Sequence, residues 1–119
     1  MGKPINGVHQ NLVDRIFNEP SLIGEDHKNL ALILKDMRYF SKMSRNNGTF
    51  CDLILLYHSK KVVCVEVKST PNGSPHGEEQ LNAAEKFFEE QGYTKIIKKL
   101  VHYDEKDNIK YKIIKNSIK

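Results

Sequence analysis

No long apolar run occurs in this 119-residue sequence, and its hydrophobic stretches fall well short of the ~18 residues that a membrane-spanning helix requires. The first ten residues, MGKPINGVHQ, contain no apolar segment typical of a signal peptide. Asn6 also stands where an N-myristoylation motif needs Ser or Thr. We therefore expect an intracellular protein without a membrane partner.

Cysteine is scarce, and the histidines are scattered. Two cysteines, Cys51 and Cys64, are too few for a disulfide framework, and we expect both to be reduced and buried rather than bonded to each other. The five histidines share no spacing typical of metal ligands. These features argue against a disulfide-rich domain and against a histidine-based zinc site.

Positive charge is in modest excess, because 19 Lys and Arg residues face 15 Asp and Glu residues, for a net charge of +4. This balance favours a polyanionic partner, although many ordinary domains are equally basic. The length and a hydrophobic content of 39% predict a single domain over residues 1–119. Residues 1–20 are expected to be an N-terminal extension with a short helix.

Two helices are expected in the N-terminal third of the chain. Residues 9–17 show a short helical stripe, and Pro20 interrupts it. Ser21 can cap a second, longer helix that reaches about Phe40, because apolar residues recur there at spacings of three and four.

The remaining two thirds predict a hairpin, a helix and two closing strands, over residues 50–70, 78–91, 95–103 and 109–115. Gly92 is expected to end the helix in the left-handed conformation. The predicted fold class is therefore α/β, with a central mixed sheet flanked by helices in the order α-α-β-β-α-β-β.

The stretch 50–70, FCDLILLYHSKKVVCVEVKST, consists of two apolar strands around a short polar turn, yet it contains Asp52, Glu66 and Lys68. A three-residue loop between the strands would place Asp52 opposite Glu66, with Cβ atoms roughly 4.5–5.5 Å apart. Lys68 follows Glu66 by two residues and so lies on the same face. The same register turns Cys51 away from the acids.

Two carboxylates at that distance repel each other unless a cation lies between them, and hard oxygen ligands suit Mg²⁺ or Mn²⁺. Lys68 could orient or deprotonate an attacking water and offset charge on a phosphate. A structural salt bridge between Lys68 and the two acids is the alternative. It too requires all three charges to cluster, because isolated buried charges are costly.

The spacing of Asp52 and the triplet Glu66-Val67-Lys68 resembles the D…ExK signature of the PD-(D/E)xK nuclease superfamily. GTFCDLI and VEVKS in this chain resemble the GxPDLI and EVKS stretches of the VRR-Nuc and archaeal Holliday junction resolvase-like members. Gln80, with a Gly-Tyr pair after the helix, resembles their downstream Q…GY. The likeness covers about residues 24–101 through a handful of positions, and a cysteine stands where the family has proline.

This resemblance implies a restriction-endonuclease-like core and cleavage of phosphodiester bonds in DNA with Mg²⁺ or Mn²⁺ as cofactor. Asp52, Glu66 and the backbone carbonyl of Val67 would bind the metal. Lys68 would position the water, and Gln80 would support the site from the following helix.

An acid on the preceding helix often completes such a site in the family, and two residues could fill that position here. Helical geometry favours Asp26, whereas residue type favours Glu25. The alternative for either is a charge that stabilises a helix N-terminus.

A basic surface is expected towards the C-terminus, where eight lysines follow Thr94. We expect backbone phosphates near a set of basic and polar residues: Lys60, Lys61, Ser69, Thr70, His76, Lys110 and Lys112. The alternative is that lysines on edge strands discourage aggregation.

The leading hypothesis is a small DNA endonuclease that acts on branched DNA or on DNA in replication, repair or recombination. A short chain offers little surface for reading bases, so recognition of shape or backbone is expected. A homodimer would supply two active sites for two strands. The alternatives are a catalytically inactive nuclease-fold protein that binds nucleic acid or a partner, a structural domain with an accidental motif, and RNA as the substrate.

Overall fold

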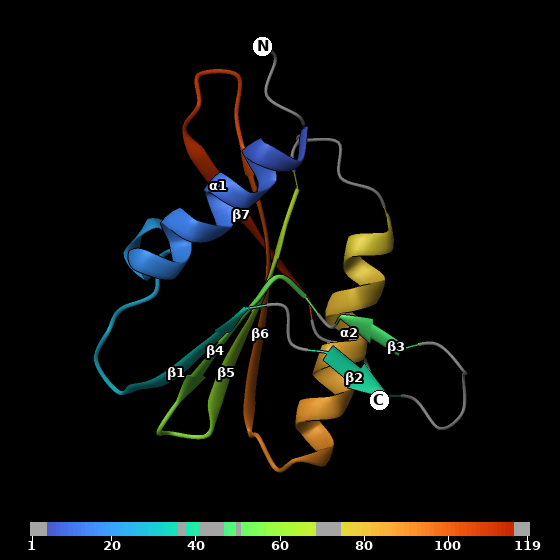
Figure 1. The fold of residues 1–119 in the computed structure, drawn as a ribbon. Coiled ribbons are helices and arrows are strands. Elements are labelled where there is room, and N and C mark those ends of the chain that lie inside the picture. The colour runs from blue at the N-terminus through green and yellow to red at the C-terminus, as the bar shows by residue number, and fades with distance from the viewer. Residues whose placement is uncertain (1–4, 36–37, 41–46, 50, 69–74, 116–119) are drawn as a thin grey trace.

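A computed structural model describes residues 5–35, 38–40, 47–49, 51–68 and 75–115 (Figure 1). Its elements in chain order are α1 (Ile5–Asn18), the 3₁₀ helix η1 (Pro20–Ile23), β1 (Leu30–Lys35), β2 (Arg38–Phe40), β3 (Asn47–Thr49), β4 (Leu53–Tyr57), β5 (Lys61–Val67), α2 (Pro75–Glu90), β6 (Lys95–Tyr103) and β7 (Ile109–Ile114).

The main sheet has five strands in the order β1-β4-β5-β6-β7. Neighbouring strands are antiparallel except for β5 and β6, which run parallel and are joined in the chain through α2. A parallel pair needs a crossover connection of this kind. The predicted α/β class, a mixed sheet flanked by helices, is therefore confirmed.

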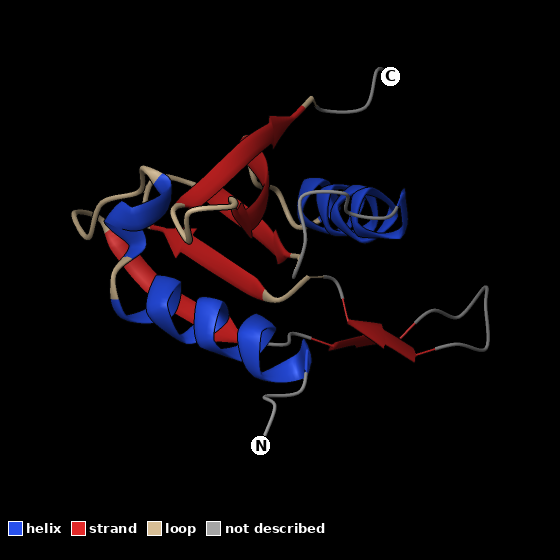
Figure 2. Ribbon diagram, turned by 90° about the horizontal axis from the view of Figure 1, so that it is seen from above, coloured by secondary structure: helices blue, strands red, loops and turns tan. Residues whose placement is uncertain are grey.

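Both faces of the sheet carry an apolar core, and Figure 2 shows α1 and α2 on opposite sides of the strands. Leu12 and Ile16 of α1 pack in one core with Leu55 of β4. Leu81 of α2 packs in the other core with Ile54. Because alternate residues of a strand face opposite sides, the β4–β5 hairpin is buried on both faces, as its sequence predicts.

The second helix expected over 21–40 is wrong. Among the described residues of this range, 21–35 and 38–40, the structure has the short η1, which Gly24 ends with a φ of 79°, and then the edge strand β1 and the strand β2. Ile33 of β1 lies opposite Leu55 of β4. A run such as LALIL satisfies helical spacing and also fits a strand, so periodicity alone cannot separate the two, and pairing with β4 decides the outcome.

The two long helices differ from their expected limits mainly at their N-termini. α1 begins at Ile5, and its Leu12 is fully buried, so the helix is part of the core rather than an appendage. α2 begins at Pro75 and ends as expected before Gly92, which has a φ of 92°. The N–H of Tyr93 donates to the carbonyl of Phe88 at 3.1 Å and closes the helix end.

β2 and β3 form a separate two-stranded arm in the chain segment between β1 and β4 (Figure 2). Lys35 at the end of β1 lies opposite Leu53 at the start of β4. The arm therefore leaves the sheet at the end where Asp52 precedes β4. Within the described ranges, neither helix is long and apolar enough to cross a bilayer.

Candidate active site

The register of the β4–β5 hairpin agrees with the prediction. Leu53 lies opposite Val65 and Leu56 opposite Val62, so one further step places Asp52 opposite Glu66. The N–H of Val67 donates to Oδ2 of Asp52 at 2.7 Å, which fixes this carboxylate against β5. The hairpin thus brings the two acids together where β4 begins and β5 ends.

Lys68 lies next to the two acids and contacts Glu66. Its Nζ lies 3.5 Å from Oε2 of Glu66, and its backbone N–H donates to the carbonyl of Val101 at 2.8 Å. The second bond continues the β5–β6 ladder by one residue and holds Lys68 at the end of the strand. We call Asp52, Glu66 and Lys68 the acid–lysine cluster.

Glu66 is only 5% exposed, and its electrostatic environment is unfavourable to a negative charge. Burial raises its pKa, the negative charge of Asp52 raises it further, and Lys68 offsets part of the effect, leaving a pKa of about 8. Its Oε1 is buried and has no hydrogen-bond partner within the described ranges. A buried carboxylate oxygen without a partner is costly unless a cation compensates it.

This arrangement fits a divalent metal with hard oxygen ligands. Asp52 and Glu66 supply two facing carboxyl groups, and Oε1 of Glu66, which has no hydrogen-bond partner within the described ranges, is open to a cation once Glu66 ionises. The described residues contain no group of three or more His, Cys, Asp and Glu side chains that could hold a metal. Mg²⁺ does not need one, because it is usually bound through one or two carboxylates together with waters and substrate phosphates.

Gln80 lies on the N-terminal half of α2 and is half-buried. Farther along this helix, Asn82 and Glu85 accept hydrogen bonds from Lys98 of β6, both at 2.8 Å. Since Lys98 pairs with Cys64 of β5, Gln80 lies closer than these two residues to the strand end that carries Glu66. Its role as a support for the acid–lysine cluster stays a prediction.

The structure does not bring Glu25 or Asp26 to that cluster. Tyr57, at the far end of β4, donates its hydroxyl to Oε1 of Glu25 and to the backbone carbonyl of Asp26, both at 3.1 Å. Tyr57 follows Asp52 by five positions, or about 16 Å along a strand. Tyr57 also belongs to the α1-side core, whereas Glu66 faces α2. Both proposed fourth ligands therefore lie at the wrong end of the sheet, because the segment that carries them is not a helix.

Glu25 instead has lysine partners. Its Oε2 lies 2.6 Å from Nζ of Lys99, and its Oε1 lies 3.2 Å from Nζ of Lys61. Burial alone would raise the pKa of Glu25, but the hydrogen bonds and charges of Lys99 and then Lys61 outweigh burial and hold it below its ordinary value. Glu25 is therefore a satisfied buried charge.

Lys98 and Lys99 are buried, although the sequence analysis includes them in the expected basic surface. Lys98 is fully buried and paired with Glu85, and Lys99 is 4% exposed and paired with Glu25. Two adjacent lysines in an apolar strand point to opposite faces, so with both faces covered each needs a buried acid. Two adjacent lysines in an apolar strand could therefore have indicated two buried ion pairs from the sequence alone.

The residues expected to contact nucleic acid divide into separate groups. Lys110 and Lys112 are exposed on β7. Lys60 is exposed in the β4–β5 turn, and Lys61 is held by Glu25, so both lie at the end of the hairpin away from the acids. His76 belongs to the first turn of α2.

The remaining two members of that set, Ser69 and Thr70, lie outside the described residues.

The cysteine prediction is right in part. Both thiols are free and buried, but Cys51 packs in the α2-side core together with Cys64 instead of facing away from it. Strand alternation fails for Cys51 because β4 begins only at Leu53, after a bend at Asp52.

No known protein family, characterised protein or solved structure matches the chain.

Proposed function

We propose that this protein is a metal-dependent nuclease that hydrolyses phosphodiester bonds in DNA at the acid–lysine cluster. The observation that carries the proposal is the pair formed by the half-buried Asp52 and the buried Glu66, in which Oε1 of Glu66 has no hydrogen-bond partner within the described ranges. In its doubly ionised form such a pair does not stabilise the fold, because the like charges and the lost hydration both act against it. A cation and an anionic substrate would compensate both.

The residues of the cluster have distinct roles in this proposal. Asp52, fixed by the N–H of Val67, and Glu66 hold Mg²⁺ or Mn²⁺ together with the backbone carbonyl of Val67. Bound there, Mg²⁺ or Mn²⁺ would supply Lewis-acid polarisation of the phosphoryl group and a water of lowered pKa. Lys68, 3.5 Å from Glu66, orients that water and offsets negative charge that builds on the phosphate. Gln80 supports the site from α2.

A restriction-endonuclease-like core is part of the same proposal. The mixed sheet, the hairpin that carries both acids and the crossover helix that follows it are compatible with that core. The substrate class follows from the resemblance of Asp52, Glu66-Val67-Lys68 and Gln80 to the PD-(D/E)xK signature. Recognition through DNA shape and backbone suits a chain of 119 residues, so branched DNA is the preferred substrate.

The test is to incubate the protein with linear, nicked and four-way-junction DNA in Mg²⁺, in Mn²⁺ and in EDTA. We expect metal-dependent cleavage that falls by at least about 10²-fold in Asp52→Asn and in Lys68→Met. Asp107→Asn is the matched control, because Asp107 is exposed and its φ of 62° is one that Asn tolerates.

Binding of DNA without metal-dependent cleavage would contradict the proposed enzymatic activity and support a nucleic-acid-binding module instead. Cleavage that persists in both cluster variants would overturn the site. Cleavage of RNA in preference to every DNA form would overturn the substrate class.

A further inference from the structure

The β5–β6 ladder places a histidine beside the acid–lysine cluster. Val67 of β5 pairs with Val101 of β6, and the N–H of Lys68 donates to the carbonyl of Val101 at 2.8 Å. One step further along both strands, Lys68 therefore lies alongside His102. Residues at equivalent positions of neighbouring strands share a face, so His102 faces the same side as Glu66 and Lys68.

The β6–β7 ladder extends this row to the edge of the sheet. His102 pairs with Lys110, and Leu100 pairs with Lys112. Tyr111, which lies between the two lysines in sequence, contacts Lys99 on the opposite face, with Nζ 4.6 Å from its ring centroid. Lys110 and Lys112 therefore face the α2 side, as His102 does.

Lys68, His102 and Lys110 thus form a row that runs across the strands, and Lys112 flanks it two residues farther along β7. At about 4.8 Å per strand, the row extends roughly 10 Å from Lys68 to Lys110. Lys110 and Lys112 are exposed and His102 is half-buried, so a ligand can reach the row. We call Lys68, His102, Lys110 and Lys112 the cross-strand row.

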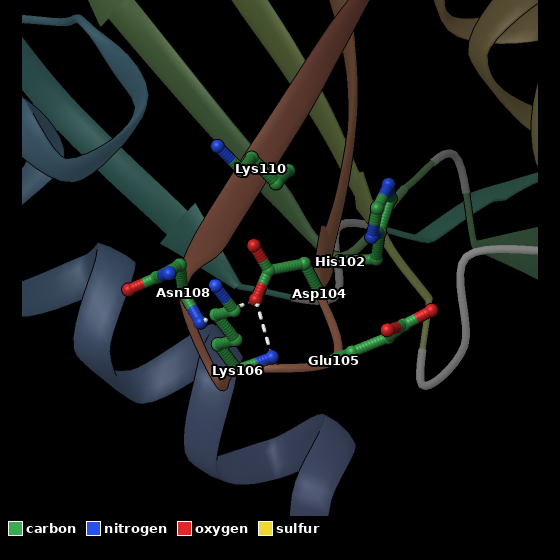
Figure 3. A pocket seen from close by; sticks show the side chains of 6 residues that line it. All are labelled: His102, Asp104, Glu105, Lys106, Asn108 and Lys110. Atoms are coloured by element: carbon green, nitrogen blue, oxygen red, sulfur yellow. Dashed lines mark hydrogen bonds between the residues drawn. The ribbon is translucent and has the colours of Figure 1, made fainter.

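At its outer end the row borders a hollow of about 450 Å³ at the β6–β7 turn, shown in Figure 3. His102 and Lys110 line this hollow together with residues of the turn. Nδ1 of His102 lies 3.0 Å from the carbonyl of Tyr103, and because a carbonyl only accepts, Nδ1 carries a proton. Nε2 is then the ring atom that can contact a ligand.

Two acids of the turn restrict where an anion can bind. Oδ1 of Asp104 accepts hydrogen bonds from the N–H groups of Lys106 and Asn108, at 2.8 and 2.9 Å, and thereby shapes the turn (Figure 3). Glu105 is exposed beside it. Both carboxylates repel an anion, so the strand residues His102 and Lys110 are the favourable contacts, and among the described residues Lys106 is the one cation that the turn itself adds to the lining of the hollow.

We propose that His102, Lys110 and Lys112 bind backbone phosphates next to the phosphate that is cleaved, so that the nucleic-acid strand crosses β5, β6 and β7. The inference rests on the proposed function for the identity of the reacting phosphate. It does not need catalysis for the binding itself. Contacts of this kind carry no base information and suit recognition through the backbone.

Fluorescence anisotropy with labelled DNA in EDTA tests the row without any cleavage. We expect His102→Ala, Lys110→Ala and Lys112→Ala each to weaken binding about 3- to 10-fold and each lysine variant to reduce the salt slope by about one. The control is Lys95→Ala, an exposed lysine at the other end of β6, which should change binding less than about twofold. Glu105→Gln should strengthen binding.

A second measurement locates the contact on the DNA. One methylphosphonate linkage beside the cleaved position removes one backbone charge, and it should weaken binding of the wild type but not of the triple variant of His102, Lys110 and Lys112. In cleavage assays the same triple variant should raise KM with little change in kcat, whereas Lys68→Met should lower kcat.

Row variants that bind metal-free DNA as tightly as the wild type, or no more weakly than Lys95→Ala, would overturn this proposal even if cleavage is observed. A wild type that binds no DNA in EDTA would overturn it as well. Row-dependent binding without any cleavage would support the row and reject only the nuclease.

Discussion

Two glutamates of this protein are about equally buried, yet their surroundings are opposite. Glu25 is 6% exposed on the α1 side of the sheet, and Glu66 is 5% exposed on the α2 side. Glu25 has two lysines within 3.2 Å and a tyrosine hydroxyl at 3.1 Å. Glu66 has another carboxylate as its neighbour and one lysine at 3.5 Å.

The consequence is that their pKa values move in opposite directions. Lysine partners hold the pKa of Glu25 below its ordinary value, and burial together with Asp52 raises that of Glu66 to about 8. Burial is common to both, so the partners decide whether a buried acid stabilises the fold. Glu25 is satisfied by the chain itself, whereas Glu66 keeps one carboxyl oxygen without a hydrogen-bond partner within the described ranges and retains its proton up to a pH of about 8.

The largest expected effect comes from breaking the satisfied pair. Lys99→Met should lower the free energy of unfolding by about 3–5 kcal/mol, because Glu25 would stay buried with Lys61 as its remaining lysine. Urea unfolding measures the change. Lys95→Met, exposed on the same strand, should stay within about 0.5 kcal/mol of the wild type. A loss below about 1 kcal/mol for Lys99→Met would show that the pair contributes little.

Removing the charge of Glu66 should change the free energy of unfolding in the opposite direction. Because the pKa of Glu66 rises from 4.5 to about 8 on folding, the folded state retains its proton at pH values where the unfolded state has lost it. Without metal, stability attributable to Glu66 should fall as the pH rises from about 4.5 to 8.

Glu66→Gln should therefore raise the free energy of unfolding by on the order of 2 kcal/mol at pH ~8.5 and flatten this slope. Glu25→Gln should be destabilising at the same pH, because the pKa of Glu25 is lowered and its contribution is present above its ordinary value of 4.5. Urea unfolding from pH ~5 to ~8.5 checks both signs. If both substitutions changed the free energy of unfolding in the same direction, the contrast between Glu25 and Glu66 would be wrong.

The smallest expected effect is the gain from metal. Mn²⁺ at ten times its Kd should raise the free energy of unfolding of the wild type by about 1.4 kcal/mol. The increment should survive in Glu25→Gln and disappear in Asp52→Asn. Unfolding in Mn²⁺ and in EDTA measures it. If the stabilisation by Mn²⁺ were lost in Glu25→Gln and kept in Asp52→Asn, the metal would have to bind near Glu25, on the other face of the sheet.

Much of the site is readable from the sequence because it depends on short-range geometry. The turn between β4 and β5 sets the hairpin register, which brings Asp52 to Glu66, and two-residue alternation adds Lys68. The end of α2 is readable because Gly92 adopts a positive φ that other residues disfavour.

What the sequence could not give depends on contacts distant in the chain. β1 forms because β4 offers a partner, and the LALIL run itself fits a helix equally well. Glu25 looked like a metal ligand because nothing near it in sequence shows that Lys99 lies 2.6 Å away. The cross-strand row requires the β6–β7 register, which places His102 beside Lys110.

The adjacent lysines of β6 also constrain how the sheet can assemble. Lys98 meets Glu85 on one face, and Lys99 meets Glu25 on the other. If β6 slid by one residue against β5, either Ile97 would replace Lys98 and Glu85 would lose its lysine, or Leu100 would replace Lys99 and Glu25 would keep Lys61 alone. Parallel pairing of distant segments forms late and can mispair. Each misaligned assembly would therefore carry a penalty of about 3–5 kcal/mol, and only the native alignment satisfies both acids.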